Sequence, residues 1–214
     1  MASVLTVNRT QVDADGARPR TGIDKRPTSG AVAVRAPGPR RSGVDGDVIG
    51  NGKLHGGDDQ AVYAYAREDL DAWAARLDRE LGNGMFGENV TTSGIDVTGA
   101  VIGERWRVGT DGVLLEVTSP RTPCKTFAAR LGIAGWIKTF ANGGTPGAYL
   151  RVIEPGSVSA GDSVEVLERP QHGVTIGLVY RALMVEKDLL PEILVADALP
   201  EDIKAAARRR AGAT

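Results

Sequence analysis

Residues 101–124 read VIGERWRVGTDGVLLEVTSPRTPC. This segment predicts two short strands, 101–108 and 112–118, because β-branched and other apolar residues dominate both runs. Gly103 lies inside the first run, where a glycine is typical of a bulge. The segment then enters a proline-bracketed loop that carries Cys124. Two short strands so close together favour a barrel or sandwich over a parallel α/β sheet.

Further short strands are predicted on both sides of this segment. The 28 glycines among 214 residues exceed the roughly 7% that is usual, which indicates tight turns between strands. Residues 46–57 and 82–94 are interpreted as loops. The additional strands are expected at residues 3–9, 31–35, 61–65, 148–153 and 163–167.

One long helix is predicted over residues 67–81. Leu70, Trp73, Leu77 and Leu81 share one face at spacings of three and four, and Gly82 supplies the expected stop. Two shorter helical segments are expected at residues 127–131 and 136–140.

The pattern changes near residue 172. Helices are predicted at 175–186, 188–197 and 200–210, and none is long enough to be stable alone in water. The sequence therefore predicts a β domain over residues 1–172 and a small three-helix extension over residues 173–214.

Composition excludes several classes of protein. Hydrophobic residues make up 42% and charged residues 25% of the chain, as in a globular protein. The formal net charge of −1 creates no field that attracts nucleic acid or anionic lipid. The single cysteine forms no internal disulfide, and no signal peptide or long apolar run is present, so we expect a cytoplasmic protein without nucleic-acid or membrane partners.

Two glycine-containing loops have the chemistry to bind anions. Lys25 and Arg26 follow Gly22, and adjacent Lys and Arg can hold a phosphate; a solvated basic loop is the alternative. Next, His55 precedes Gly56 and Gly57, whose backbone amides can approach an anion closely; a tight turn beside a structural histidine is the alternative.

A third loop surrounds Cys124. Pro120 and Pro123 stiffen it, and Arg121 and Lys125 flank the thiol, which favours the nucleophilic and metal-binding thiolate. The alternative is a small buried hydrophobic residue.

These loops occur in an order that resembles one family, the MOSC domain, named for the C-terminal domain of molybdenum cofactor sulfurase. The tail from Val174-Thr175 is similar to the three-helix extension of its stand-alone bacterial subgroup. The motifs are Thr21-Gly22-Ile23-Asp24-Lys25-Arg26, Gly46-Asp47, His55-Gly56-Gly57, Phe86-Gly87-Glu88-Asn89-Val90-Thr91-Thr92, Pro120-Arg121-Thr122-Pro123-Cys124, Gly147-Ala148-Tyr149-Leu150-Arg151-Val152 and Gly161-Asp162.

The resemblance implies a mainly β, MOSC-type barrel with helical insertions that binds the pterin-based molybdenum cofactor. It implies that Cys124 ligates molybdenum through its soft thiolate, and that Glu88 positions substrate or a proton. The other residues expected to contact cofactor are Lys25, Arg26, His55, Gly56, Gly57, Phe86, Asn89 and Arg121.

The resemblance also implies an activity, the reduction of N-hydroxylated compounds such as hydroxylamino bases to amines. Because the chain has no flavin or cluster motif, electrons are expected from a separate reductase. Two alternatives stay open: a sulfur carrier with a persulfide on Cys124, and a non-catalytic cofactor-binding protein. Family loops often have a second histidine before His-Gly-Gly, where this chain has Leu54, so a role that needs paired histidines is not expected.

Overall fold

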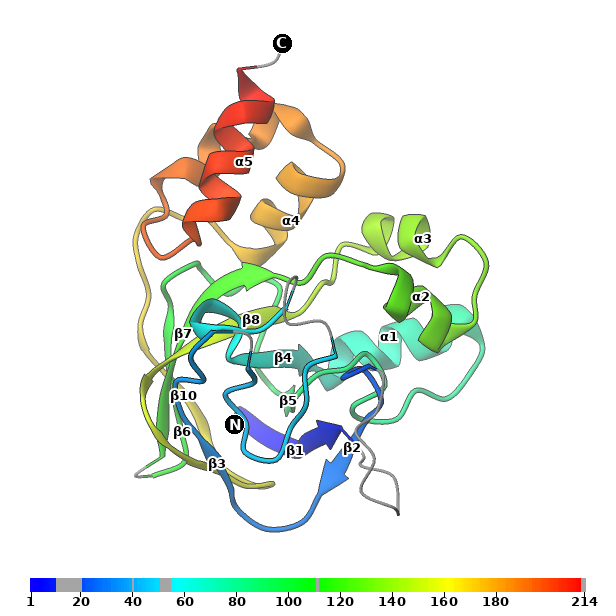
Figure 1. Ribbon diagram of the computed structural model, residues 1–214, viewed down its shortest axis with the longest axis vertical. Coiled ribbons are helices and arrows are strands. Elements are labelled where there is room, and N and C mark those ends of the chain that lie inside the picture. The colour runs from blue at the N-terminus through cyan, green and yellow to red at the C-terminus, as the bar shows by residue number, and fades with distance from the viewer. Residues whose placement is uncertain (11–20, 40, 51–54, 111, 213–214) are drawn as a thin grey trace.

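An eight-stranded mixed sheet forms the frame of the molecule in the computed structural model, which describes residues 1–10, 21–39, 41–50, 55–110 and 112–212 (Figure 1). Its strand order is β10-β6-β7-β8-β4-β5-β1-β2, and β4 and β5 are parallel while the other neighbours are antiparallel. A separate antiparallel pair joins β3 to β9. The strands are β1 Ser3–Thr10, β2 Lys25–Thr28, β3 Val32–Val34, β4 Val62–Ala66, β5 Val90–Ser93, β6 Arg105–Val108, β7 Val113–Pro120, β8 Ala148–Glu154, β9 Gly156–Val158 and β10 Val164–Glu168.

The strand pairing does not establish the closed barrel that we expected. β2 occupies the C-terminal half of one edge of β1, where Val7 to Thr10 pair with Thr28 to Lys25. Only the start of β1 is left to approach the other end of the sheet. There an isolated bridge joins Ser3 to Ser163, and the Val4 amide donates to the Asp162 carbonyl at 2.8 Å. The amides of Gly161 and Val164 also donate to the carbonyls of Val4 and Ala2 at 2.8 and 3.0 Å. The sheet therefore curls until its ends meet over these few residues, without a continuous ladder between β1 and β10.

Helices α1 to α3 lie on one side of the sheet, and α4 and α5 stand at one end of the molecule (Figure 1). The helix predicted over 67–81 ends early, at Leu77, because Asp78 adopts a left-handed conformation with φ 48°. Asp is one of the few non-glycine residues that tolerate this conformation. The helical segments are α1 Arg67–Leu77, α2 Lys125–Leu131, α3 Trp136–Gly143, α4 Ile176–Met184 and α5 Glu201–Ala211, with 3-10 turns η1 Asp58–Gln60, η2 Lys187–Leu189 and η3 Glu192–Val195.

Two predicted loops contain strands instead. Residues 82–94 include β5, and Arg26 and Pro27 lie in β2. Proline is tolerated there because β2 is an edge strand, where one side needs no ladder hydrogen bond. The predicted strand 101–108 begins only at Arg105, since Gly103 has φ +86° and the Glu104 amide closes a turn onto the Val101 carbonyl at 2.8 Å.

The tail differs from the prediction of three helices. The middle segment consists of η2 and η3, on either side of Pro191, which lacks the amide that a continuous helix would need. Ile176 and Val179 of α4 belong to the same apolar core as Val117 of the sheet. The tail thus covers part of the sheet, and its separation as a domain at residue 172 stays a prediction.

A second core lies beside the sheet core, on the side of α1 to α3. We call it the aromatic cluster. Its buried members are Tyr63, Tyr65, Leu70, Trp73, Leu81, Phe86, Phe127, Leu131, Trp136, Phe140 and Tyr180.

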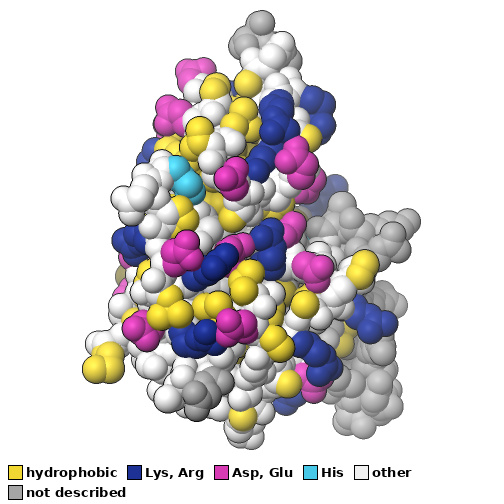
Figure 2. Space-filling model, turned by 90° about the vertical axis from the view of Figure 1, so that its left-hand side faces the viewer, with side chains coloured by type: hydrophobic (Ala, Val, Ile, Leu, Met, Phe, Trp, Pro, Cys, Tyr) yellow, Lys and Arg dark blue, Asp and Glu magenta, His cyan; other side chains and the backbone are white. Residues whose placement is uncertain are grey.

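The outer surface carries charges of both signs. Figure 2 shows basic and acidic side chains interspersed with hydrophobic ones over one face. Two ion pairs join side chains of the sheet strands: Arg107 with Glu154 at 2.7 Å and Arg105 with Glu116 at 3.3 Å. Among the described residues, no helix has the length and apolar content that crossing a membrane requires. The cytoplasmic location stays a prediction.

The position of Ile176 yields a test of how the tail is built into the fold. Because this side chain is fully buried against the sheet core, Ile176→Ala should lower the free energy of unfolding by about 2–5 kcal/mol in urea titrations. Val185→Ala, at a side chain 53% exposed, should change it by less than about 0.5 kcal/mol. A separate early transition of the tail in the Ile176 variant would contradict the shared core.

Candidate functional site

A cavity of about 440 Å³ opens where several loops meet. This volume lies within the range of about 300–1,000 Å³ that small-molecule sites occupy. Residues from the 21–25, 42–50, 55–60 and 121–126 segments line it. The structure brings six of the predicted site residues to this wall: Lys25, His55, Gly56, Asn89, Arg121 and Cys124.

Four other predicted residues are not part of the lining. Arg26 has a side chain 65% exposed, 3.7 Å from the Asp24 carboxylate, and Gly57 precedes the η1 turn. Phe86 is buried in the aromatic cluster, where its ring lies 5.0 Å from that of Phe127. Glu88 is the fourth.

Glu88 is fully buried, and its carboxylate is occupied by its own loop. It accepts hydrogen bonds from the amides of Gly84 and Phe86, and from the Thr91 hydroxyl at 3.0 Å. Burial raises the pKa of this carboxyl despite these donors. The contacts assign Glu88 to holding the 84–91 segment behind the cavity wall; its expected role toward substrate stays a prediction without geometric support.

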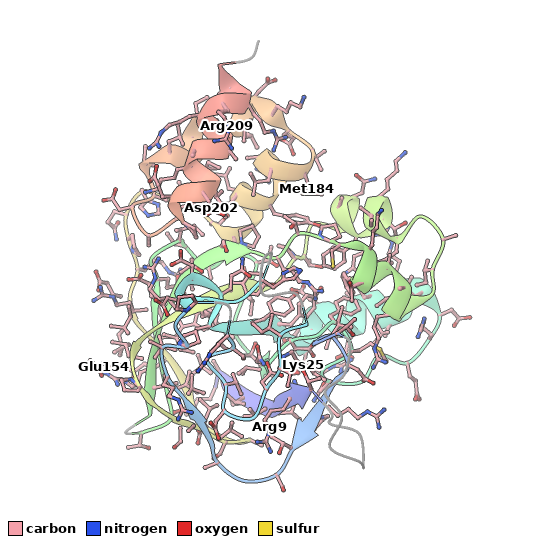
Figure 3. The ribbon with its side chains drawn as sticks, viewed as in Figure 1. Arg9, Lys25, Glu154, Met184, Asp202 and Arg209 are labelled. Atoms are coloured by element: carbon pink, nitrogen blue, oxygen red, sulfur yellow. The ribbon has the colours of Figure 1, made fainter. Side chains whose placement is uncertain are left out.

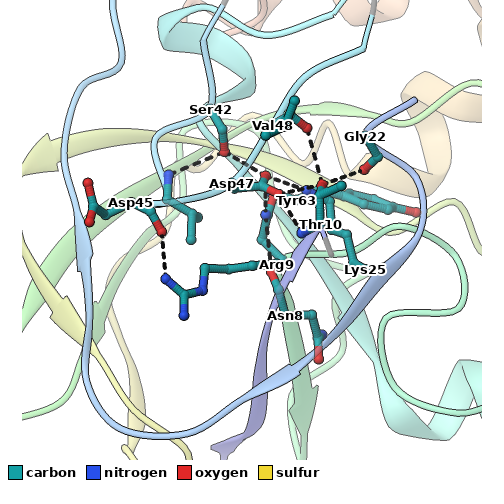
Figure 4. Close-up of polar contacts among 12 residues, drawn as sticks. Asn8, Arg9, Thr10, Gly22, Lys25, Ser42, Asp45, Asp47, Val48 and Tyr63 are labelled. Atoms are coloured by element: carbon teal, nitrogen blue, oxygen red, sulfur yellow. Dashed lines mark hydrogen bonds and ion pairs between the residues drawn. The ribbon is translucent and has the colours of Figure 1, made fainter. Parts of the chain in front are cut away.

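The side chain of Asp47 organises one side of the cavity (Figure 4). Its carboxylate forms an ion pair with Lys25. It also accepts hydrogen bonds from the Thr10 amide and hydroxyl at 2.9 and 2.8 Å, from the Ser42 hydroxyl at 2.8 Å and from the Asn89 amide nitrogen at 2.9 Å. One buried carboxylate therefore joins β1, β2, the 42–47 loop and the residue before β5.

This ion pair changes the expected role of Lys25. Burial alone would raise the pKa of Asp47, but Lys25 and the hydrogen-bond donors outweigh it and hold that pKa below its usual value. Burial lowers the pKa of Lys25, which Asp47 partly restores. The Lys25 side chain is only 7% exposed, and Figure 3 shows it within the outline of the β portion, whereas Glu154 lies at its edge. Because its charge is already balanced, Lys25 contributes little net positive charge toward a cofactor phosphate.

Cys124 presents the only thiol of the chain to the cavity. It immediately precedes α2 and is partly exposed. A hydrogen bond from His55 lowers the pKa of the thiol to about 6, with further help from the Phe127 amide and the Arg121 charge, against the opposing effect of burial. The sulfur is therefore mostly thiolate at neutral pH, the form that acts as nucleophile and metal ligand.

Arg121 is a buried cation next to this sulfur. It donates a hydrogen bond to the Phe86 carbonyl, and its guanidinium lies over the Phe127 ring at 4.3 Å and the Tyr63 ring at 5.2 Å. These contacts compensate part of the cost of burying its charge. With the Lys25 charge paired to Asp47, Arg121 supplies the buried positive charge on the Cys124 side of the cavity.

Comparison with known proteins identifies the family. A family profile described as "MOSC domain" matches residues 51–165, more than half of the chain. The chain belongs to the MOSC domain family.

Relatives of this MOSC protein include bacterial and fungal proteins. YflK from Bacillus subtilis is 34% identical over 182 residues, which cover 84% of this chain and 79% of YflK. A protein named Reductase from Gibberella moniliformis is 31% identical over 194 residues, which cover 88% of this chain and 33% of that protein. YiiM from Escherichia coli is 32% identical over 130 residues, which cover 59% of this chain and 57% of YiiM.

Solved structures show the same fold. YiiM from Geobacillus stearothermophilus superimposes with a TM-score of 0.80 at 26% identity, covering 99% of this chain and 100% of that one. YiiM from Escherichia coli superimposes with a TM-score of 0.75 at 23% identity, covering 100% of this chain and 94% of that one.

Sequence reasoning missed two tyrosines of the MOSC cavity, Tyr63 and Tyr149. Both lie on adjacent strands, β4 and β8, where they pair directly, and their ring centroids are 5.1 Å apart. Burial raises the pKa of both hydroxyls, so they keep their protons. Every residue of β4 is buried, so no alternation along that strand distinguished the cavity face. Leu54, which replaces the second histidine of the family loop, lies outside the described residues.

The buried ion pair predicts that substitutions of two aspartates lower the free energy of unfolding by very different amounts. Asp47→Asn removes the partner of buried Lys25 and should lower the free energy of unfolding by about 3–5 kcal/mol. Asp45→Asn, which breaks the exposed pair with Arg35 at 2.8 Å, should cost no more than about 1 kcal/mol. Urea unfolding measures both free energies, and equal small losses would show that the buried ion pair does not stabilise the fold. Because the pKa of Asp47 is lowered by folding, its stabilisation exists above about pH 4 and is lost as the pH falls further.

The His55–Cys124 hydrogen bond predicts the pH profile of thiol alkylation. The rate with iodoacetamide, followed by intact mass, should rise with pH and be half-maximal near pH 6, where the Cys124 pKa lies. His55→Gln should move the midpoint upward, toward the ordinary cysteine value of about 8.5. His172→Gln is the matched control, because this second histidine bonds the Val174 amide elsewhere in the fold. An unchanged midpoint in the His55 variant would count against the pairing.

Proposed function

We propose that this MOSC protein binds the pterin-based molybdenum cofactor in the described cavity and reduces N-hydroxylated compounds to amines. The observation that carries the proposal is the thiolate of Cys124, which faces the cavity beside His55 and Arg121. A soft thiolate with open space before it suits a transition metal better than a hard cation. The fungal relative named Reductase supports reduction as the reaction class.

The residues present fit such a group. Cys124 would ligate the metal, and Arg121 would face an anionic or hydrogen-bonding part of the cofactor. Tyr149 offers a protonated hydroxyl on the same wall, and both tyrosines offer ring surface. The Tyr63 hydroxyl already donates to the Pro146 carbonyl at 2.7 Å. Asn89 has a different role, since its side chain bonds the Asp47 carboxylate and accepts from the Tyr63 amide at 3.2 Å. When bound, the cofactor would supply two-electron redox chemistry that no side chain of the chain provides.

The net reaction is balanced by two electrons and two protons. The N–O bond of a hydroxylamine breaks, the nitrogen becomes an amine, and the oxygen leaves as water. The chain's part is to hold the reacting group beside Cys124 in a cavity whose walls are fixed by buried contacts. We expect the electrons to come from a separate reductase, which needs access to the mouth of the cavity.

A second candidate function rests on the same thiol. A partly exposed cysteine with a pKa of about 6 is suited to accept a sulfur atom and carry it as a persulfide. Under this alternative, incubation with a cysteine desulfurase and cysteine should add sulfur to Cys124, visible in the intact mass. A third alternative, cofactor binding without catalysis, predicts bound cofactor and no reduction of any hydroxylamine.

Metal content tests the leading proposal directly. Protein purified from a host that makes the cofactor, grown with molybdate, should contain near-stoichiometric molybdenum and pterin, and Cys124→Ala should lose most of the metal. Thr122→Ala is the matched control, since this exposed residue lies in the same loop without lining the cavity. Reduction of a hydroxylamino base with a chemical donor should follow the metal content.

Either of two results would contradict that proposal. Full metal content in Cys124→Ala would remove the thiolate as ligand. Metal present in the wild type without any turnover would leave only the binding function.

A further inference from the structure

Helix α4 of the C-terminal tail faces two cores at once. Ile176, Val179 and Ala182 are spaced by three and belong to the sheet core. Tyr180 and Met184, spaced by four, contact the aromatic cluster instead, and Figure 3 shows Met184 at the end of α4 nearer to the α3 side. Residues three and four apart lie on neighbouring parts of a helix surface. One helix of the tail thus contacts both the sheet and the segment that follows Cys124.

Tyr180 makes this second contact through its ring and its hydroxyl. The side chain is fully buried, and its hydroxyl donates to the Phe140 carbonyl at 3.3 Å. The rings of Tyr180 and Phe140 meet edge to face, with centroids 6.2 Å apart. Phe140 lies in the last turn of α3, where carbonyls lack partners within the helix. Tyr180 therefore supplies a donor to the end of α3 from outside it.

The contacts continue from Phe140 to the thiol. Phe140 and Trp136 of α3 pack on Phe127 of α2, with ring centroids 4.9 and 5.4 Å away. The Phe127 amide in turn donates to the Cys124 sulfur, and the Phe127 ring carries the Arg121 guanidinium at 4.3 Å. Two packed aromatic side chains, Phe140 and Phe127, thus connect Tyr180 to Arg121 and Cys124 of the cavity wall.

We infer that Tyr180 is a positioning residue through which the C-terminal tail holds the α2–α3 segment, and with it Cys124, in place. The segment α2–α3 begins at the residue after Cys124, so a shift of α3 moves the backbone next to the sulfur. Because Tyr180 acts on protein groups alone, this inference does not depend on the cofactor or on the proposed reaction. It gives the tail a role toward the cavity besides covering the sheet.

The experiment compares the rate at which a neutral maleimide labels Cys124, the single cysteine of the full chain, in variants of α4. Tyr180→Leu keeps apolar bulk but removes both the ring edge and the hydroxyl. Its labelling rate per thiolate, obtained by dividing the rate by the thiolate fraction from its pH profile, should rise by roughly two- to thirtyfold, because α2 holds the sulfur less firmly; this is the range expected when a residue outside a site modulates it. Tyr180→Phe keeps the ring and should restore most of the wild-type rate.

Val179→Ala is the matched control. It lies beside Tyr180 on α4 and is equally buried, but it packs in the sheet core. Its labelling rate should match that of the wild type even where its melting temperature falls as far as that of Tyr180→Leu. Each variant is labelled well below its melting temperature, so that global unfolding does not contribute.

Two outcomes would overturn the inference. One is a wild-type labelling rate in Tyr180→Leu. The other is an equal increase in Val179→Ala, which would show a general loosening instead of a specific path. All variants are purified from a host that does not make the molybdenum cofactor, so that no metal on Cys124 slows the labelling. Neither outcome then depends on whether the proposed reductase activity is found.

Discussion

The buried ion pair between Lys25 and Asp47 is the constraint on which the cavity depends. Asp47 accepts hydrogen bonds from Thr10, Ser42 and Asn89 in addition to the contact with Lys25. These partners come from β1, from its neighbour β2 at the edge of the sheet, from the 42–47 loop and from the residue that leads into β5. A carboxylate removed from water is tolerated only when its charge and its lone pairs are satisfied. The requirement to satisfy Asp47 therefore draws the surrounding loops into one arrangement, and that arrangement leaves the cavity open in front of Cys124.

The opposite wall is organised by aromatic packing around a buried cation. Arg121 lies between the rings of Tyr63 and Phe127 and bonds the Phe86 carbonyl. The same Phe127 supplies the amide that contacts the Cys124 sulfur. The Cys124 side chain, at the start of α2, is thus packed against the aromatic cluster, and a binding site requires support of this kind from its neighbours. The two walls differ in chemistry. The wall around Asp47 is polar and its charges are balanced by the ion pair with Lys25, whereas the wall around Arg121 is apolar apart from that one cation.

Local patterns explain which elements could be predicted. The apolar spacing of Leu70, Trp73 and Leu77 produced α1 correctly apart from its end, where the left-handed Asp78 stops it before Gly82. β2 was missed because Pro27 disfavours a strand unless the strand lies at an edge, and edge position is a property of the sheet. β5 was missed because Val90 to Ser93 is short and follows a glycine-rich segment. The barrel was expected from the spacing of short strands and from the resemblance. The pairing of β1 with β2 leaves one isolated bridge and three backbone hydrogen bonds to join the start of β1 to the other end of the sheet.

In the site, too, some properties depend on neighbours in the sequence and others on contacts between residues far apart in the sequence. Residue types alone indicated a reactive thiol at Cys124, flanked by cations and stiffened by prolines, because those effects act over a few neighbouring positions. The order of motifs indicated the MOSC family, which the comparisons confirm. Which charges remain unpaired could only be decided in three dimensions, because charge partners are chosen by distance in space and by burial. Lys25 is balanced by Asp47, Glu88 is occupied by the amides of its own loop, and Tyr63 and Tyr149 meet across two paired strands. The sequence by itself therefore determined the family and singled out the Cys124 sulfur as the candidate reactive atom, while the tertiary structure decided which of the surrounding residues face that atom.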